Sequence, residues 1–165
     1  MKKLVLVLVV VLLASMVAMA QEEKAQVFGG YQFASLGGGG ESRVNIAKGW
    51  DADLAVKATK NFGIVADFSG GYKDGGKIHT FMFGPRFSGN VGKVTPFAEA
   101  LFGAAHGSGF GDSATDFAFG FGGGIDAHVN KKVAFRVAKL DYVIIRESGV
   151  NLNAVRIATG IVFKF

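Results

Sequence analysis

The sequence predicts an all-β protein, specifically an eight-stranded antiparallel up-and-down β-barrel that spans a membrane. Three observations support this fold class. The 165 residues include 25 Gly and 16 Phe, and glycine is unfavourable in helices whereas phenylalanine suits the pleated surface of a sheet. Apolar residues recur at every second position, and turn-forming residues divide the chain into eight such segments. Half of the residues are apolar and 19% are charged, which excludes a disordered chain.

Residues 1–20 are predicted to be a cleaved secretory signal peptide. Lys2 and Lys3 form a basic start, a long apolar run follows, and Ala18-Met19-Ala20 has the small-residue pattern of a cleavage site. The alternative is an N-terminal transmembrane anchor, but polar residues follow Ala20 at once. The mature chain, residues 21–165, loses two lysines and carries a net charge of +3. It has no dense basic stripe, so we expect no nucleic-acid binding.

The eight alternating segments define the expected strands. In one of them Phe81, Phe83 and Phe87 alternate with Gly84 and Arg86, which is the period of a strand and not of a helix. We expect strands at 25–36, 48–58, 62–72, 77–88, 94–106, 115–128, 133–146 and 154–165. Tight connections at 59–61, 89–93 and 130–132 are expected to alternate with longer ones at 37–47, 73–76, 107–114 and 147–153, as in bacterial outer-membrane barrels.

The polarity of the two strand faces distinguishes a membrane barrel from a soluble lipocalin-like barrel. A soluble barrel places its bulky apolar residues inside and its charges outside. Here the charges share a face with Gly, Ala and Ser, which suit a narrow lumen, while the bulky face is almost free of charge. A Lys or Arg in lipid near the midplane would cost about 2–4 kcal/mol. The bulky face is therefore expected to contact lipid, and only a closed barrel satisfies the backbone there.

The seventh strand requires an irregularity. With uniform alternation Lys139 and Asp141 would face lipid. A β-bulge near Val137-Ala138 would shift the register and return both to the lumen, leaving Tyr142 facing lipid.

The C-terminal segment resembles a known signal. Residues 157–165 (IATGIVFKF) look like the terminal strand of outer-membrane proteins, with Ile161, Phe163 and Phe165 at the signal positions. Segments 65–70 (VADFSG) and 83–87 (FGPRF) also resemble the small outer-membrane β-barrel domain family, the OmpA-like and opacity-like porin superfamily. The resemblance implies a multi-pass protein in the outer membrane of a Gram-negative-type bacterium, inserted by the barrel assembly machinery.

Charged residues on the small-residue face are assigned to the lumen. We expect an ion-pair network that plugs a narrow barrel, since eight strands leave room for little more than side chains. A small pore is the alternative. The network is expected to contain Asp67, Arg86, Glu99, Asp126, Arg136, Lys139, Asp141 and Arg156, with Asp51, Asp53 and Lys57 also facing inward.

Aromatic residues near the strand ends are expected to form two belts at the membrane interfaces. The belt near the longer loops contains Trp50, Tyr72 and Tyr142, and the belt near the short turns contains Phe62, Phe87 and Phe135.

Catalytic and cofactor sites are not expected. His106, Ser108 and Asp112 lie close together, but in a Gly-rich loop and without the surrounding motif of the lipid-modifying barrels. The glycine clusters at 37–40 and 120–124 are not followed by a helix that could hold a phosphate. His79, His106 and His128 lack metal-ligand spacing.

The expected function is therefore a non-enzymatic structural or surface-interaction role in the cell envelope. The alternatives are a small porin with a narrow polar lumen and an outer-membrane lipid-modifying enzyme. We expect a monomer whose partners are outer-membrane lipid and, during biogenesis, the assembly machinery.

Overall fold

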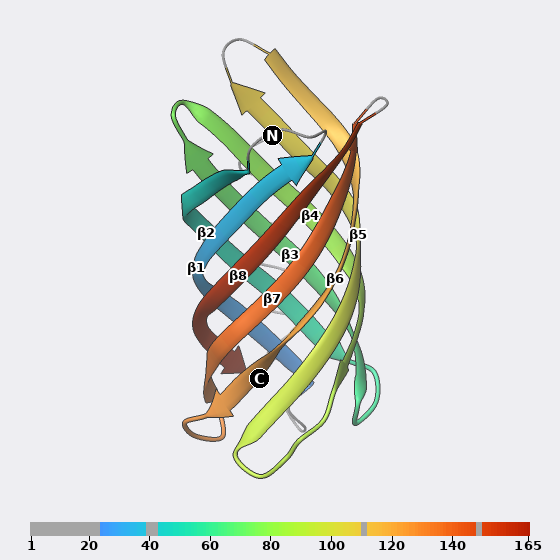
Figure 1. Ribbon diagram of the computed structural model, residues 1–165. Coiled ribbons are helices and arrows are strands. Elements are labelled where there is room, and N and C mark those ends of the chain that lie inside the picture. The colour runs from blue at the N-terminus through green and yellow to red at the C-terminus, as the bar shows by residue number, and fades with distance from the viewer. Residues whose placement is uncertain (1–23, 39–42, 110–111, 148–149) are drawn as a thin grey trace, which may run out of the picture.

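A computed structural model describes residues 24–38, 43–109, 112–147 and 150–165. Its eight strands form one closed antiparallel barrel in which each strand pairs with its sequence neighbours (Figure 1). The predicted signal peptide, residues 1–20, lies outside the described ranges. Within those ranges there is no helix with the length and hydrophobicity to cross a bilayer. The strands are β1 (Ala25–Gly38), β2 (Val44–Lys57), β3 (Phe62–Lys73), β4 (Gly76–Ser88), β5 (Val94–Gly109), β6 (Asp112–His128), β7 (Val133–Glu147) and β8 (Val150–Lys164).

Pairing of the first strand with the last closes the barrel. Thirteen residues of β1, from Gln26 to Gly38, pair in unbroken register with residues 152–164 of β8. The Phe165 N–H extends this ladder by donating to the Ala25 carbonyl at 2.8 Å. Closure leaves neither strand with an open edge, which is the condition for placing a sheet in lipid.

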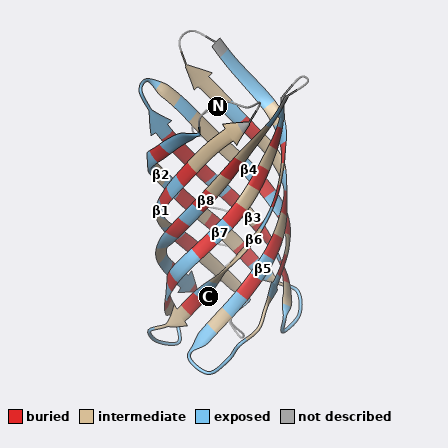
Figure 2. Ribbon diagram, viewed as in Figure 1, coloured by how far each residue is buried: buried red, intermediate tan, exposed pale blue. Residues whose placement is uncertain are grey.

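The barrel has its apolar side chains outside and its charges inside. Along β4, Phe81 and Phe83 are 50% and 54% exposed, whereas Met82 between them and Arg86 further on are buried. Figure 2 shows the same alternation of buried and exposed positions along every strand. The predicted fold class is confirmed: the outer surface suits lipid and the inner surface is packed.

The predicted bulge is present in β7. On β6, Ile125 pairs with Ala138 and Asp126 pairs with Arg136, so Val137 has no partner in that ladder. The pairing with β8 is interrupted at the same place, between Arg136 and Lys139. The extra residue turns both Arg136 and Lys139 inward, where each is fully buried.

Three of the connections predicted to be long are short in the structure. Lys73 pairs with Gly76, which leaves Asp74 (φ 47°) and Gly75 (φ 83°) as the two positive-φ positions of a type I′ hairpin turn. Within the predicted connection 107–114, Gly109 pairs with Asp112. Similarly, β8 begins at Val150, inside the predicted loop 147–153. The first long connection also shortens, because β1 ends at Gly38 and β2 starts at Val44.

The reason is that the strands continue beyond the bilayer. A strand needs about 9–11 residues to cross a membrane, whereas β5 has 16 and β6 has 17. Their joint hairpin rises above the rest of the barrel in Figure 1. Outside the lipid nothing requires one face to be apolar, so the hydrophobic alternation stops while the backbone pairing continues.

The bulge provides a direct test of the register. Deleting both Val137 and Ala138 should prevent folding, because Arg136 and Lys139 would become neighbours on opposite faces of β7, and a basic side chain in lipid costs about 2–4 kcal/mol near the midplane. The measurement is refolding into phospholipid vesicles, followed by the heat-modifiable mobility of the folded barrel on gels. Deleting Val137 alone removes only the extra residue, leaves Arg136 and Lys139 two positions apart on the luminal face, and should still allow refolding. A double-deletion variant that folded with unchanged stability would show that the luminal position of Arg136 and Lys139 does not set the register of β7.

Candidate functional site

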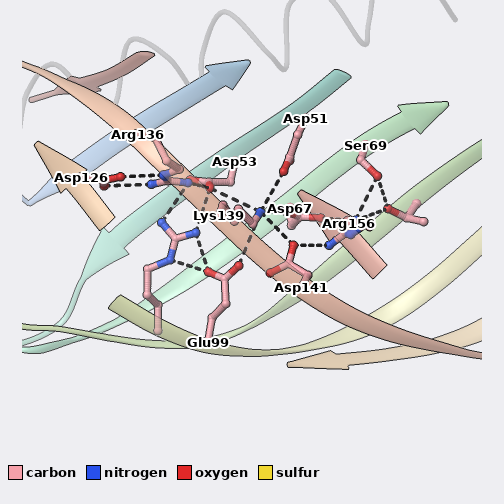
Figure 3. A network of polar contacts seen from close by, with 12 residues as sticks. Asp51, Asp53, Asp67, Ser69, Glu99, Asp126, Arg136, Lys139, Asp141 and Arg156 are labelled. Atoms are coloured by element: carbon pink, nitrogen blue, oxygen red, sulfur yellow. Dashed lines mark hydrogen bonds and ion pairs between the residues drawn. The ribbon is translucent and has the colours of Figure 1, made fainter. Parts of the chain in front are cut away.

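The lumen is filled by a network of buried charges with Lys139 at its centre (Figure 3). The Lys139 ammonium forms its shortest contact with the Asp67 carboxylate. Its Nζ also lies 3.1 Å from Asp51 Oδ2, 3.5 Å from Glu99 Oε1 and 3.6 Å from Asp141 Oδ2. One cation on β7 therefore gathers carboxylates from β2, β3 and β5, as well as from its own strand.

Two guanidinium groups continue the network toward the short-turn end. Arg86 donates from Nη2 to Asp53 Oδ2 at 2.8 Å and from Nε to Glu99 Oε2 at 2.6 Å. Arg136 donates from Nη1 to the same Asp53 oxygen at 2.5 Å and holds both oxygens of Asp126, at 2.7 and 3.0 Å. The Arg136–Asp126 pair is bidentate, the strongest geometry for such a pair.

Arg156 forms the other end of the network. It donates from Nη2 to Asp141 Oδ2 at 2.8 Å, and Nη1 reaches Asp67 Oδ1, Ser69 Oγ and Thr80 Oγ1 at 3.0–3.2 Å. With this arginine on β8, seven of the eight strands contribute a polar side chain. All eight residues expected in the network, and Asp51 and Asp53, are buried in the lumen.

Lys57, also assigned to the lumen, lies apart from this network. It is half-buried at the short-turn mouth, where it lines a recess with Lys24 and Lys164. No ion pair among the described residues includes it. Without Lys57, the network joins six carboxylates to four cationic groups among the described residues.

The first strand contributes an aromatic ring in place of a charge. The Arg136 guanidinium lies between the rings of Phe28 and Phe97, 4.2 and 4.5 Å from their centroids, and Arg86 stacks on Phe97 at 4.5 Å. Cation–π contacts of this kind strengthen when water is excluded. The sequence interpretation, which placed phenylalanine mainly against lipid, missed these two inward rings.

Two glycines of the 120–124 cluster make room for the network. A Cβ atom on Gly122 would collide with the Asp141 carboxylate, and one on Gly124 would lie 2.7 Å from Phe97 Cζ. These glycines therefore allow close packing in a narrow lumen, as the small-residue face of the sequence indicated.

Three of the carboxylates could hold a metal ion by their spacing alone. Asp51, Asp67 and Asp141 are buried, and each offers an oxygen within 4.8 Å of the others. The Lys139 ammonium lies beside all three, so the protein supplies its own cation at this point. Of these three carboxylates, Asp51 has the fewest hydrogen-bond donors, because neither of its oxygens accepts a hydrogen bond from the described residues.

The structure describes the side chains of His106 and Ser108 in the His–Ser–Asp cluster, whereas the side chain of Asp112 lies outside the described part. His106 and Ser108 lie two residues apart on β5, which separates their Cα atoms by about 7 Å. The His106 Nδ1 contacts Thr115 Oγ1 at 2.8 Å, and not a carboxylate that could orient the ring. Residues 107–109, predicted to lie in a loop, instead extend β5. The structure also places His79 directly opposite His106 across β4 and β5, a pairing that their sequence positions do not reveal.

The match to a family model covers nearly the whole chain. Residues 6–165 match the model described as outer membrane protein beta-barrel domain. The chain belongs to this family. No curated protein sequence is significantly similar to this outer-membrane barrel.

Several solved structures share the fold of this outer-membrane barrel. Neisserial surface protein A (NspA) is 16% identical with a TM-score of 0.70, and the match covers 86% of this chain and 97% of that one. Ail, the attachment invasion locus protein of Yersinia pestis, is 18% identical with a TM-score of 0.60, covering 87% and 100%. OprG from Pseudomonas aeruginosa is 10% identical with a TM-score of 0.55, covering 87% and 97%. At these identities the likeness concerns the fold alone.

The aromatic residues expected in the belts lie on the outer surface of this family member. Trp50 Nε1 donates to the Tyr72 hydroxyl at 3.3 Å, and Tyr142 packs against Phe121 with ring centroids 5.6 Å apart. Near the short turns, Phe62 and Phe87 form an edge-to-face pair at 5.0 Å, and Phe135 is exposed. Their arrangement therefore offers aromatic surface toward both ends of the barrel.

The residues of the predicted terminal signal also face outward. Ile161, Phe163 and Phe165 are each about half exposed. They belong to the strand that closes the barrel, in which Ile161 pairs with Gly29 and Phe163 with Val27. The apolar face of the last strand is therefore available from outside the barrel.

Replacing the central cation tests the energetics of the network. Lys139→Met keeps the length of the side chain but leaves several buried carboxylates without their shared partner. We expect a loss of about 3–5 kcal/mol in the free energy of unfolding, the cost of breaking a buried ion pair from one side. The measurement is urea-induced unfolding in phospholipid vesicles.

Asp51→Asn is the matched control within the same network. It removes a carboxylate from a set in which acidic groups outnumber basic ones, so we expect no loss of stability. Equal destabilisation by both variants would contradict the role assigned to Lys139, because it would indicate a packing effect and not an electrostatic one.

Proposed function

We propose that the protein is a multi-pass, monomeric protein of the outer membrane of a Gram-negative-type bacterium, with a non-enzymatic structural or surface-interaction role. The observation that carries the proposal is the buried network: charges from seven strands meet in the lumen of a barrel whose outer surface is apolar. Such a barrel is a rigid scaffold that holds its protruding strand ends at the membrane surface.

The network argues against the porin alternative. Eight strands enclose a lumen just wide enough for side chains, and here Arg136, Lys139 and Asp67 are each fully buried within it. An ion could pass only if the pairs around Lys139 separated, which would expose several uncompensated charges at once. The absence of a histidine–carboxylate pair beside Ser108 among the described residues similarly weakens the enzyme alternative.

The outer surface supports the two expected partners. Exposed apolar side chains such as Ile64 and Phe87, 58% and 59% exposed, would contact the acyl chains of membrane lipid. Ile161, Phe163 and Phe165 present one apolar face of the last strand, which suits recognition by the barrel assembly machinery before closure.

Planar bilayer recording tests the scaffold proposal. The wild-type protein should insert without producing stable, defined conductance steps, because the network closes the lumen. The variant Arg136→Ala/Lys139→Ala, if refolded, should conduct more readily, since it removes two of the bulkiest luminal side chains. Well-defined channels from the wild-type protein would overturn the plug and favour the porin.

One feature of the rim favours a surface-interaction role. Lys48, Lys73 and Lys77 surround a hollow of about 390 Å³ beside Tyr72 and the β3–β4 turn. Among the described residues that line it, Asp74 is the one acidic residue, so the hollow suits a sulfate or phosphate group. Ail of Yersinia pestis has been crystallised in complex with the heparin analogue sucrose octasulfate, which supports a polyanion as the partner class.

Charge-neutralising variants test this interaction. Lys48→Gln/Lys73→Gln/Lys77→Gln should weaken binding to immobilised heparin and reduce the dependence of that binding on salt, because fewer counterions are released. The control Lys60→Gln/Lys93→Gln/Lys131→Gln removes the same charge from the opposite rim and should bind as the wild type does. Equal loss in both variants would indicate attraction by net charge alone, and would contradict a site at the β3–β4 turn.

A further inference from the structure

We propose that the lumen opens, at the end opposite the short turns, into a closed-ended binding site for a small cationic amphiphile. The ligand would be a molecule with a short alkyl or aryl group and an ammonium-type head. This proposal goes beyond a scaffold role, because it assigns a ligand class to the interior of the barrel.

The site is a hollow of about 280 Å³ at the mouth of the lumen. It is formed by five consecutive strands, β4 to β8, and its wall is mainly apolar. Ala105 and Ile145 in this wall are almost completely buried, which places the hollow on the inner side of the sheet. The wall residues that matter here are Ile78, Ala105, Ala114, Asp116, Ile145 and Leu152.

The order of residues along β7 shows what lies beneath the hollow. Its inward residues run from Lys139 and Asp141 in the charged network, through Val143, to Ile145 in the wall. Val143 belongs to a buried apolar cluster with Met82 and Leu101, against which Ile78 and Leu152 also pack. An apolar floor thus separates the hollow from the network, and a ligand that entered from outside could not pass further.

The apolar wall and floor define one half of the ligand. Most of the lining surface is apolar, although Ser108 and Ser113 also contribute to it, so an apolar group that displaces water from this surface gains free energy. The volume lies just below the roughly 300–1,000 Å³ of pockets that hold drug-sized ligands. The hollow therefore suits a group of about six to ten carbon atoms and excludes a complete lipid.

Asp116 defines the charge of the ligand's head group. It pairs with Ala105 across β5 and β6 and shares its inward side. The side chain is half-buried, and no ion pair within the described ranges includes it. A carboxylate beside an apolar hollow complements a cationic head, whereas an anionic head would be repelled.

Methyl NMR in nanodiscs separates this site from the bilayer. Hexyltrimethylammonium is titrated into protein with labelled isoleucine methyl groups. We expect saturable shifts at Ile78 and Ile145, which line the hollow, and none at Ile125 and Ile161, which face lipid. Hexanesulfonate, with the same chain and the opposite charge, should bind more weakly. Equal shifts at all four isoleucines would overturn the proposal, because they would indicate partition into lipid only.

Two variants test the two halves of the ligand. Asp116→Asn should weaken the binding of hexyltrimethylammonium about two- to fivefold, which is the contribution of a partly exposed ion pair to affinity. The same variant should leave the binding of hexanol unchanged. Ala114→Trp should fill the hollow and abolish saturable binding of either compound, in protein whose gel mobility shows that it is folded. Wild-type affinity in both folded variants, or tighter binding of hexanesulfonate than of the cation, would overturn the proposal. Bilayer conductance is read separately, so a failure here leaves the scaffold proposal standing.

Discussion

The constraint on which the structure depends is that a charge in the lumen of a membrane barrel has to find its partner within that lumen. Lipid on the outside offers no solvation, and an eight-stranded lumen holds little water. Lys139 meets this constraint by contacting carboxylates from several strands at once. The bulge at Val137 and the missing side chain at Gly122 are consequences, since the first aims Lys139 inward and the second leaves space for Asp141.

The network also divides the barrel into two unlike ends. Toward the short turns, the Arg136 guanidinium between Phe28 and Phe97 fills the lumen with stacked flat groups. Toward the long hairpins the charges give way to the apolar cluster around Met82 and Leu101, and then to the open hollow. The two ends therefore offer chemically different surfaces to a ligand.

The sequence predicted the membrane-spanning part of the fold and most of the luminal charges. The reason is physical, because lipid on one side and a narrow lumen on the other impose strict alternation along each strand. A charge such as Asp67 can therefore be assigned to the luminal face from its position in that alternation alone. The same reasoning located the bulge, because uniform alternation would have placed Lys139 against lipid. It did not locate the strand ends near Gly109 and Val150, since outside the bilayer the alternation is no longer required.

The alternation of side chains along a strand does not predict which residues of different strands come into contact. Phe28 shares the inward face of β1 with the buried residues Gln32 and Ala34, but its contact with the Arg136 guanidinium depends on the arrangement of separate strands around the barrel. Likewise His79 and His106 meet only because β4 and β5 pair in one particular register. Alternation along a strand determines the face on which a side chain lies. Its neighbours are determined by the register between strands, which depends on the whole closed sheet.

This distinction bears on how function is distributed over the barrel. The fold is shared with NspA at 16% identity over 97% of that chain, so most particular side chains can differ while the fold is kept. A change within the network disturbs partners on several strands at once, whereas a change at Lys77 or Asp116 affects a single mouth or rim. Specific binding is therefore expected where substitutions are energetically independent of the network, at the protruding strand ends and the open hollow, and the buried charges serve to hold those surfaces in place.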